Sequence, residues 1–204
     1  MALTGFFVYG GLGLTSTIAA ADIPTDTISQ AAPTYPIYTV SMTAYNAVPG
    51  QTDSNPNITA SGAFSNPQII AARSIDLADK LPFGTIIAIQ AATTTPNCGY
   101  QYVADKIGLR VIGDSMAARM RNKIDILMDA DEYIPAQLGK LRNPAKALGF
   151  CRGVQIVVVG HVDIHNIPKT QEELALAMLH TENIATNVPT TTPERLAVND
   201  LSIY

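Results

Sequence analysis

Basic and charged residues are scarce in this sequence. Of the 204 residues only 13 are Lys or Arg and 15% are charged, whereas 47% are hydrophobic, and the formal net charge is −4. A nucleic-acid surface needs clustered basic side chains, so this composition argues against a nucleic-acid partner, and an uncharged ligand fits better. It also excludes a disordered chain or a coiled coil, and the length allows one domain with a proper core plus tails.

Cysteine is almost absent, with only Cys98 and Cys151 in the chain. Neither belongs to a CxxC motif or lies beside a catalytic-looking His, which argues against a thiol nucleophile. The pair forms either one disulfide, as is common in exported proteins, or two independent buried thiols. The sequence does not choose between these two alternatives.

No charged side chain occurs in residues 1–21. An apolar run from Phe6 to Leu14 and small residues up to Ala21 indicate a secretory signal cleaved near Ala21, although no Lys or Arg precedes the run. An uncleaved membrane anchor is the alternative, but the run is short for a span of about 20 residues. We therefore expect a cell-envelope protein or a secreted one, with N-terminal membrane contact before cleavage.

The composition divides the rest of the chain into three parts. Residues 22–36 are rich in Pro, Thr and Ala and lack apolar periodicity, which predicts a linker. Residues 37–165 form the predicted globular domain. Residues 166–204 are predicted to hold a C-terminal helix and a flexible tail.

Strand signals dominate the globular part. In residues 37–45 the apolar side chains of Val40 and Met42 alternate with Thr and Ser, the pattern of a half-buried strand. Short strands separated by Gly, Pro and Asn turns predict a barrel or a sandwich. The other expected strands are 68–72, 85–90, 100–104, 109–112, 123–128 and 154–159.

Two helices are expected beside these strands. One covers residues 135–148 and ends at Gly149. The other covers residues 170–179, where Thr170 and Glu173 fit a capping box.

Three aspartates lie in segments that carry strand signals: Asp76, Asp105 and Asp125. Because side chains alternate along a strand, the carboxylate of Asp125 faces away from Ile124 and Ile126. On a solvent-facing strand this carboxylate would only add solubility. On the floor of a groove, desolvation would raise its pKa and make it a general acid near neutral pH.

Residues 39–160 contain an ordered set of short motifs: TAY…TASG, LPFGT, an expected strand ending in Asp105, KIDILM, an expected helix ending at Gly149, and the expected strand VQIVVV. In this order and spacing the motifs resemble the 3D (three-aspartate) domain family. The family consists of bacterial cell-wall proteins related to the catalytic domain of membrane-bound lytic transglycosylase A. The resemblance implies a mainly β fold, a six-stranded double-psi β-barrel with one or two short peripheral helices.

The same resemblance assigns the three family aspartates to Asp76, Asp105 and Asp125, with Asp79 as an alternative to Asp76. The chain departs from the family between the last two of these. The family has a short glycine-rich link there, DTGGAIKG, whereas this chain has KIGLRVIGDSMAARMRNKI without a Gly-Gly pair. The segment DSMAARMR is therefore expected to reshape one wall of the groove.

The activity implied by the resemblance is that of a lytic transglycosylase, which cleaves the β-1,4 bond between MurNAc and GlcNAc in peptidoglycan strands. Asp125 would be the single catalytic acid–base, and Asp105 would raise its pKa as a like charge. Asp76 would hold the groove or orient a donor. No metal or other cofactor is expected.

The polar loop after the first strand is implied to bind the glycan. Tyr45, Thr59, Ser61 and Gly62 would border the groove and offer a ring, hydroxyl groups and backbone groups to a sugar. The alternative is that residues 59–62 only make a tight turn, with Gly62 at positive φ.

Two other functions remain open, and one further cluster of residues has the composition of a metal site. Related barrels of the expansin-like and rare-lipoprotein-A-like kinds bind or loosen wall glycans with little or no cleavage, and a structural envelope protein is a third possibility. His161, Asp163 and His165 would face one way on a strand and resemble zinc ligands. No further ligand is visible nearby, so we expect no metal there.

Overall fold

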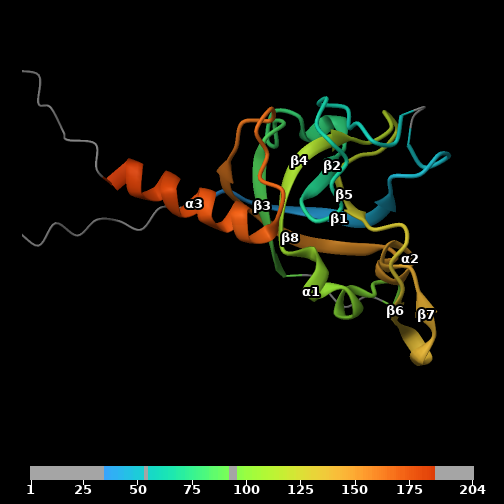
Figure 1. Ribbon diagram of the computed structural model, residues 1–204. Coiled ribbons are helices and arrows are strands. Elements are labelled where there is room, and N and C mark those ends of the chain that lie inside the picture. Colours follow the sequence, from blue (N-terminus) through green and yellow to red (C-terminus); the bar gives the residue numbers. More distant parts are fainter. Residues whose placement is uncertain (1–34, 53–54, 92–95, 187–204) are drawn as a thin grey trace, which may run out of the picture. The chain divides into compact units, whose positions relative to one another are not determined.

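The computed structural model describes residues 35–52, 55–91 and 96–186 (Figure 1). The expected export signal at 1–21, residues 22–34 of the linker and the tail after residue 186 lie outside these ranges. The strands are β1 (Ile37–Asn46), β2 (Ile70–Arg73), β3 (Thr85–Ala91), β4 (Leu109–Ser115), β5 (Lys123–Met128), β6 (Ile134–Pro135), β7 (Leu141–Arg142) and β8 (Cys151–His161). The helices are α1 (Ala104–Ile107), α2 (Pro144–Leu148) and α3 (Gln171–Thr186), with 3-10 turns η1 (Ile75–Leu77), η2 (Tyr100–Tyr102) and η3 (Gln137–Gly139).

Six of these strands close into a mixed barrel in the order β1-β5-β2-β4-β3-β8. The pairs β1–β5 and β2–β4 are parallel, and the remaining pairs of the barrel are antiparallel. Strands β6 and β7 form a separate two-stranded hairpin. The predicted mainly β fold with a six-stranded barrel and few short helices is confirmed.

Alternation along the strands builds the core. On β1 the side chains of Val40 and Met42 are buried, and on β5 those of Ile124 and Ile126 are buried in the same cluster. Burying an aliphatic side chain of this size stabilises the fold by about 1.5–3 kcal/mol. The prediction that Asp125 faces away from its two isoleucine neighbours is confirmed, because both isoleucines point into this core.

The predicted strand at 100–104 is wrong. The chain forms η2 and α1 there, because Val103 and Ile107 are one helical turn apart and both are buried. Gly108, with φ 54°, ends the helix at a conformation that favours glycine. Asp105 consequently lies on the exposed side of a short helix and not at the end of a strand.

The predicted helix at 135–148 is right only in its last turn. Residues 134–142 form the β6–β7 hairpin, and α2 begins after Asn143, whose side chain accepts a hydrogen bond from the N–H of Ala145. Pro144 occupies the first helical position, where a missing N–H costs nothing. The expected stop at Gly149 is confirmed, with φ 65°.

The C-terminal helix α3 begins where predicted and runs longer, to Thr186. The Thr170 hydroxyl accepts a hydrogen bond from the N–H of Glu173 at 3.2 Å, and the Glu173 carboxylate accepts from the N–H of Lys169 at 2.6 Å. Leu174 is buried against the barrel. Within the described residues, no helix combines the length and apolarity needed to cross a membrane.

Cys98 and Cys151 form a disulfide, with their Cα atoms 4.6 Å apart. The bridge joins the segment before η2 to the first residue of β8. Of the two alternatives left open by the sequence, the structure has the disulfide.

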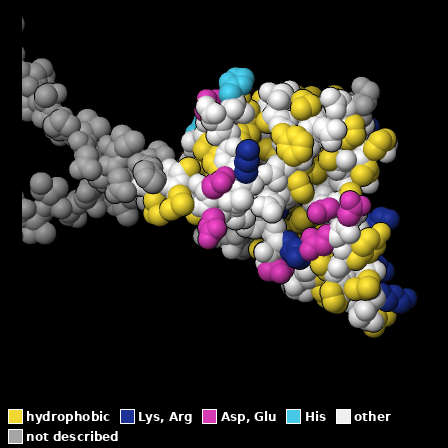
Figure 2. All heavy atoms as spheres, viewed as in Figure 1, with side chains coloured by type: hydrophobic (Ala, Val, Ile, Leu, Met, Phe, Trp, Pro, Cys, Tyr) yellow, Lys and Arg dark blue, Asp and Glu magenta, His cyan; other side chains and the backbone are white. Residues whose placement is uncertain are grey.

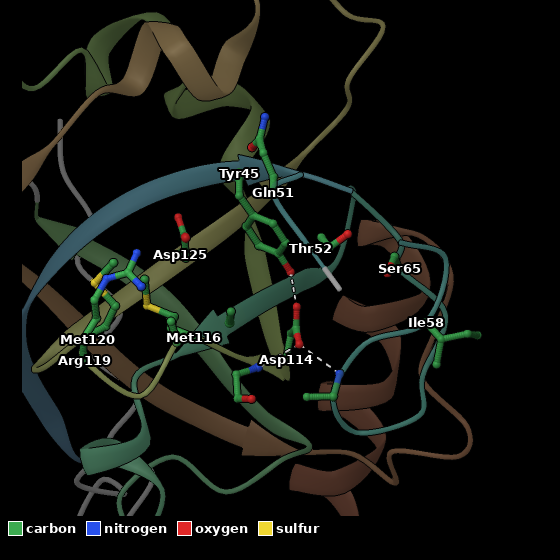
Figure 3. A pocket seen from close by; sticks show the side chains of 14 residues that line it. Tyr45, Gln51, Thr52, Ile58, Ser65, Asp114, Met116, Arg119, Met120 and Asp125 are labelled. Carbon is green, nitrogen blue, oxygen red and sulfur yellow. Dashed lines mark hydrogen bonds between the residues drawn. The ribbon is translucent and has the colours of Figure 1, made fainter. Parts of the chain in front are cut away.

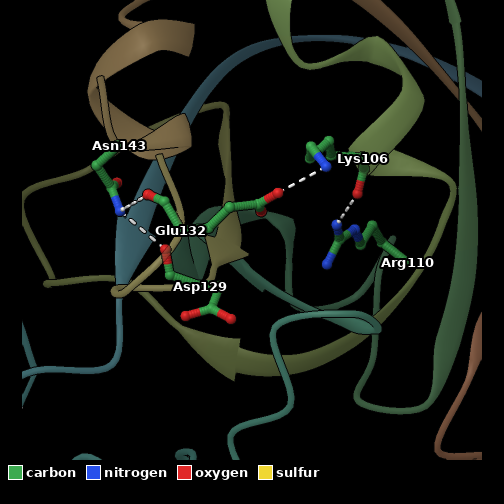
Figure 4. A network of polar contacts seen from close by, with 5 residues as sticks. All are labelled: Lys106, Arg110, Asp129, Glu132 and Asn143. Atoms are coloured by element: carbon green, nitrogen blue, oxygen red, sulfur yellow. Dashed lines mark hydrogen bonds and ion pairs between the residues drawn. The ribbon is translucent and has the colours of Figure 1, made fainter. Parts of the chain in front are cut away.

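A buried guanidinium braces the barrel from inside. Arg110 on β4 is fully buried and donates hydrogen bonds to the carbonyl groups of Lys106, Ile107, Pro67 and Leu127. Burial lowers its pKa to about 10, so the side chain stays charged at neutral pH. Figure 4 shows this contact beside the ion pair of Lys106 and Glu132, whose charged atoms lie 2.6 Å apart.

Candidate functional site

A groove of about 470 Å³ is lined by residues of β1, β2, β4 and β5 and by the loop after β1 (Figure 3). Tyr45, Asp114 and Asp125 face it together with Met116 and Arg119. Two other hollows, of about 530 and 650 Å³, are larger, but neither is lined by an Asp or a Glu. The groove is therefore the better candidate for acid–base chemistry.

Both groove aspartates flank the same residue of β2. Asp125 pairs with Ala72 across the antiparallel β5–β2 ladder, and Asp114 pairs with Ala72 across the parallel β2–β4 ladder. Thr43 on β1 continues this row, since it pairs with Asp125. Neighbouring strands lie about 4.8 Å apart, so the row sets the Cα atoms of the two aspartates about 10 Å apart.

A β-bulge turns Asp114 toward the groove. Along β4, Ile112 pairs with Ala71 and Asp114 pairs with Ala72, which leaves Gly113 as an extra residue. Ile112 is in the core, and strict alternation would place Asp114 on the same face. The extra residue moves Asp114 to the other face, and the freed carbonyl of Gly113 accepts a hydrogen bond from the N–H of Ser61 at 3.3 Å.

The carboxyl group of Asp125 has one hydrogen-bond donor in the described part of the chain. The Thr43 hydroxyl donates to its Oδ1 at 2.7 Å. Burial raises the pKa of Asp125 to about 6; the negative charge of Asp114 adds to this effect, while Thr43 and Lys123 oppose it. Asp125 can therefore carry a proton near neutral pH and also release it.

The carboxyl group of Asp114 is held by three donors. The Tyr45 hydroxyl donates to Oδ2 at 2.7 Å, and the N–H groups of Ala60 and Ser115 donate to Oδ1 at 2.9 and 2.8 Å (Figure 3). Burial, and then the neighbouring Asp114 charge, raises the pKa of Tyr45, so its hydroxyl stays protonated and remains a donor. Asp114 is thus a fixed acceptor, in contrast to Asp125.

The structure does not bring the predicted Asp105 to the groove. Asp105 is exposed on α1, next to Lys106, and is not among the residues that line the groove. The second carboxylate beside Asp125 is Asp114 instead. The expectation that Asp105 and Asp125 converge is therefore wrong, and the cause is the short helix that replaces the expected strand.

Asp76 is exposed in η1 and also lies off the groove lining. Its Oδ2 accepts a hydrogen bond from the N–H of Asn122 at 2.9 Å. The Ser74 side chain and this backbone N–H hold the pKa of Asp76 below its usual range. Asn122 has φ 46° and immediately precedes β5, so Asp76 braces the turn that leads into the strand of Asp125.

Of the four predicted glycan-binding residues, Tyr45 lines the groove and the other three do not. The buried hydroxyl of Thr59 lies 3.0 Å from that of Ser61 and donates to the carbonyl of Ala63 at 3.1 Å. Gly62, with φ 86°, donates its N–H to the carbonyl of Thr59. Residues 59–62 therefore make the tight turn that was the alternative reading, and this turn delivers the N–H of Ala60 to Asp114.

Sequence reasoning missed Asp114 and Thr43. One signal for Asp114 was present: Asp114-Ser115 opens the segment DSMAARMR with an acid followed by a hydroxyl residue, as the family link DTGGAIKG opens with Asp-Thr. Asp105 was the stronger candidate for the second carboxylate, because its neighbours carry strand signals. Thr43 carries no local signal, because only the pairing of β1 with β5 sets it beside Asp125.

The predicted alternation of His161, Asp163 and His165 on one strand is wrong. Strand β8 ends at His161, and the Asp163 carboxylate accepts a hydrogen bond from the N–H of His165 in the turn that follows. In the described ranges, no group of three or more His, Cys, Asp or Glu is arranged to hold a metal ion.

A comparison of the sequence with models of known protein families and with curated proteins finds no match. The case for a function therefore comes from the groove itself.

Proposed function

We propose that this chain is an exported lytic transglycosylase that cleaves the β-1,4 bond between MurNAc and GlcNAc in peptidoglycan. Asp125 is its single catalytic acid–base, and Asp114 and Tyr45 form the opposite wall of the glycan groove. The observation that carries the proposal is the contrast between two carboxyl groups on one groove. Asp125 has a pKa raised to about 6 and one hydrogen-bond donor, whereas Asp114 has three donors.

This contrast favours a transglycosylase over a hydrolase. A glycoside hydrolase needs a second carboxyl group to activate water or to attack the sugar. Three donors hold Asp114 in one position and use three of its roughly four lone pairs, so it is less suited to either task than a free carboxylate. A transglycosylase uses the C6 hydroxyl of MurNAc as its nucleophile and needs one carboxyl group, which Asp125 supplies.

Each step of the reaction has an atom to receive the proton. The protonated Asp125 gives its proton to the glycosidic oxygen while the bond from this oxygen to MurNAc C1 breaks, which frees the GlcNAc hydroxyl. The C6 oxygen of MurNAc then bonds to C1, and its proton returns to the Asp125 carboxylate. The product is a 1,6-anhydro ring, and Asp125 ends in its starting protonated form, as a catalyst must.

The wall formed by Tyr45 and Asp114 has a separate role in this proposal. Tyr45 presents its ring at the groove while its hydroxyl is engaged by Asp114. A ring held in this way is a rigid apolar face on which a sugar can stack. The negative charge of Asp114 also favours the protonated form of Asp125, the form that begins the reaction.

Two further features support the proposal. The mixed six-stranded barrel is compatible with the double-psi barrel of the 3D family. In this proposal Asp114 takes the role first given to Asp105. The Cys98–Cys151 disulfide is of the kind that persists in oxidising compartments, which agrees with export.

The test is incubation of the purified protein with peptidoglycan sacculi, followed by mass spectrometry of the soluble products. The wild type is expected to release 1,6-anhydro muropeptides, and Asp125→Asn is expected to lower this release by about a thousandfold or more, since the proposed proton donor is lost. Asp105→Asn is the matched control, and we expect it to keep full activity because its carboxylate is exposed on α1.

Three outcomes separate the alternatives. Full activity of Asp125→Asn would remove this residue from the mechanism. Products with reducing MurNAc ends would indicate hydrolysis. Co-sedimentation with sacculi without released products would identify an expansin-like binding or loosening module.

A further inference from the structure

The β6–β7 hairpin projects from the barrel beside α2 and carries exposed apolar side chains at its end (Figures 1 and 2). Leu138 is 89% exposed, the largest value among the exposed large hydrophobic residues, and Leu141 and Tyr133 are 67% and 65% exposed. These apolar side chains are exposed on a projection and add nothing to the hydrophobic core. Exposed apolar patches mark interaction sites. The name hairpin tip is used here for Leu138 and Lys140 at the turn together with Leu141, Arg142 and Tyr133, of which Arg142 and Tyr133 lie nearest the base of the hairpin.

The backbone at the end of the tip is strained as well as exposed. Leu138 has φ 61° and ψ 27°, and Gly139 has φ 69°, which makes them the central pair of a type I′ turn. Asn or Asp is the usual residue before Gly in this turn, because a Leu in the left-handed region is sterically unfavourable. The chain therefore keeps an apolar side chain where neither packing nor backbone geometry favours it, and such strain is typical of functional positions.

The charge of the tip has one sign. Lys140 and Arg142 are exposed, and residues 133–142 contain no Asp or Glu. Lys146 on the adjacent α2 is exposed too. Figure 2 shows basic side chains beside the hydrophobic ones on this projection, at the lower right of the molecule. The surface that complements the tip is therefore anionic with an apolar layer beneath it.

The base of the hairpin is held firmly. The Asn143 side chain donates to the carbonyl groups of Asp129, Ala130 and Glu132, and Glu132 pairs with Lys106 of α1 (Figure 4). Ile134 and Ala136 are buried in the core cluster. The tip is thus presented by an anchored arm, so little ordering is needed when it binds a surface.

We propose that the hairpin tip inserts into the interfacial layer of an anionic phospholipid bilayer. Leu138 and Leu141 enter the boundary of the acyl chains, Lys140 and Arg142 meet the phosphate groups of the lipids, and Tyr133 lies at headgroup depth. A soluble polyanion would engage the two basic residues and leave the strained Leu138 without an apolar phase. This inference does not rest on the proposed activity of the groove.

The chain contains no tryptophan, so one Trp introduced at the tip reports on its surroundings alone. The full-length Leu138→Trp variant is mixed with phosphatidylcholine vesicles that contain about one third phosphatidylglycerol, with and without bromine on the acyl chains. We expect a blue shift of its emission and quenching by the brominated lipid, both much weaker with pure phosphatidylcholine. Ile75→Trp, an exposed position in η1, is the matched control and is expected to show neither effect.

A second variant separates membrane binding from folding. Leu138→Asn places a residue that tolerates positive φ at the turn, so thermal stability is expected to hold or rise while vesicle binding falls by about tenfold. The N-terminal segment is the same in both proteins, so it does not affect the comparison. Equal binding by this variant and the wild type, or equal quenching of the two Trp reporters, would overturn the proposal. So would binding that depends on Lys140 and Arg142 without any quenching, because that result indicates a soluble polyanion.

Discussion

The hydroxyl of Tyr45 donates to Oδ2 of Asp114 at 2.7 Å, although the two residues lie on strands that are not neighbours in the barrel. Strands β5 and β2 lie between β1 and β4, and they carry Asp125 and Ala72. The hydrogen bond therefore joins two strands that β2 and β5 separate, and β5 carries the proposed acid. It fixes one wall without occupying the oxygens of Asp125.

Tyr45→Phe removes this hydrogen bond and keeps the ring. One oxygen of Asp114 loses its donor, so we expect the free energy of unfolding to fall by about 1 kcal/mol. Glycan release is expected to fall with it, because Asp114 can then leave its fixed position. Tyr38→Phe on the same strand is the control, since that ring packs on the core and its hydroxyl makes no hydrogen bond to the described part of the chain. A Tyr45→Phe protein as stable and active as the control would contradict the role given to this contact.

The raised pKa of Asp125 makes stability depend on pH in a defined direction. An unfolded aspartate titrates near pH 4, whereas Asp125 in the folded protein has a pKa of about 6. The folded state therefore binds the proton more tightly. The stabilisation that the folded state gains from protonated Asp125 is fully present below pH 4 and is lost as the pH rises through 6.

Between pH 4 and pH 7, the free energy of unfolding of the wild type is expected to fall by at most about 3 kcal/mol relative to that of Asp125→Asn. Denaturant titrations at several pH values measure it. Other titrating groups are common to both proteins and cancel. A difference that is constant with pH would show that Asp125 has an ordinary pKa.

Thr43→Val tests the link between the hydroxyl at Asp125 and catalysis. The Thr43 hydrogen bond holds the pKa of Asp125 lower than burial alone would, so its loss is expected to raise that pKa further. The proton donor then stays protonated to higher pH, and the alkaline limb of kcat/KM for anhydro-muropeptide release moves upward. Thr39→Val, at an exposed position on the same face of β1, should leave the profile in place. A shift to lower pH would be the opposite of what this contact requires.

The disulfide closes a loop whose ends are 53 residues apart in sequence. Chain-entropy arguments assign a crosslink of this length a stabilisation of about 4 kcal/mol. Cys98→Ala with Cys151→Ala is therefore expected to lower Tm strongly, and a reducing agent should lower the Tm of the wild type in the same way. The double variant itself should not respond to the reductant, which separates loss of the bridge from other effects of reduction.

Replacing Arg110 is expected to damage the fold more than replacing any exposed basic residue. Arg110→Met leaves several buried carbonyl groups without a donor, and each lost partner costs about 1–3 kcal/mol. Arg110→Lys should rescue little, because one ammonium group cannot reach carbonyls that the guanidinium contacts on separate segments. Arg119→Met, at an exposed position, is the control. Thermal unfolding of the three variants gives the comparison, and equal Tm values would refute a bracing role for Arg110.

Local patterns identified most of the barrel and one of its two groove aspartates. Ile124 and Ile126 fixed the direction of Asp125, because strand alternation is a property of the backbone that needs no partner. Thr170 and Gly149 marked helix ends for an equally local reason, the hydrogen bonds and φ angles that those ends require.

The errors arose where a local pattern suited two structures. Val103 and Ile107 are apolar at a spacing that also suits a helical turn, and both are buried at α1. There tertiary packing decided between two local options. The segment 135–142 has helix-forming residues, but a turn at Leu138-Gly139 makes it a hairpin.

The sequence by itself determined the strands of the barrel and the direction of Asp125, since both follow from contacts between residues close together in the chain. Only the tertiary structure decided which second carboxylate lies beside Asp125 in the groove. Asp114 reaches the groove through a bulge at Gly113, visible only once β4 pairs with β2, and it is held there by Tyr45 and Ala60 from distant segments. Hydrogen bonds between such segments exist only after the barrel has closed, and no nearby residue encodes them.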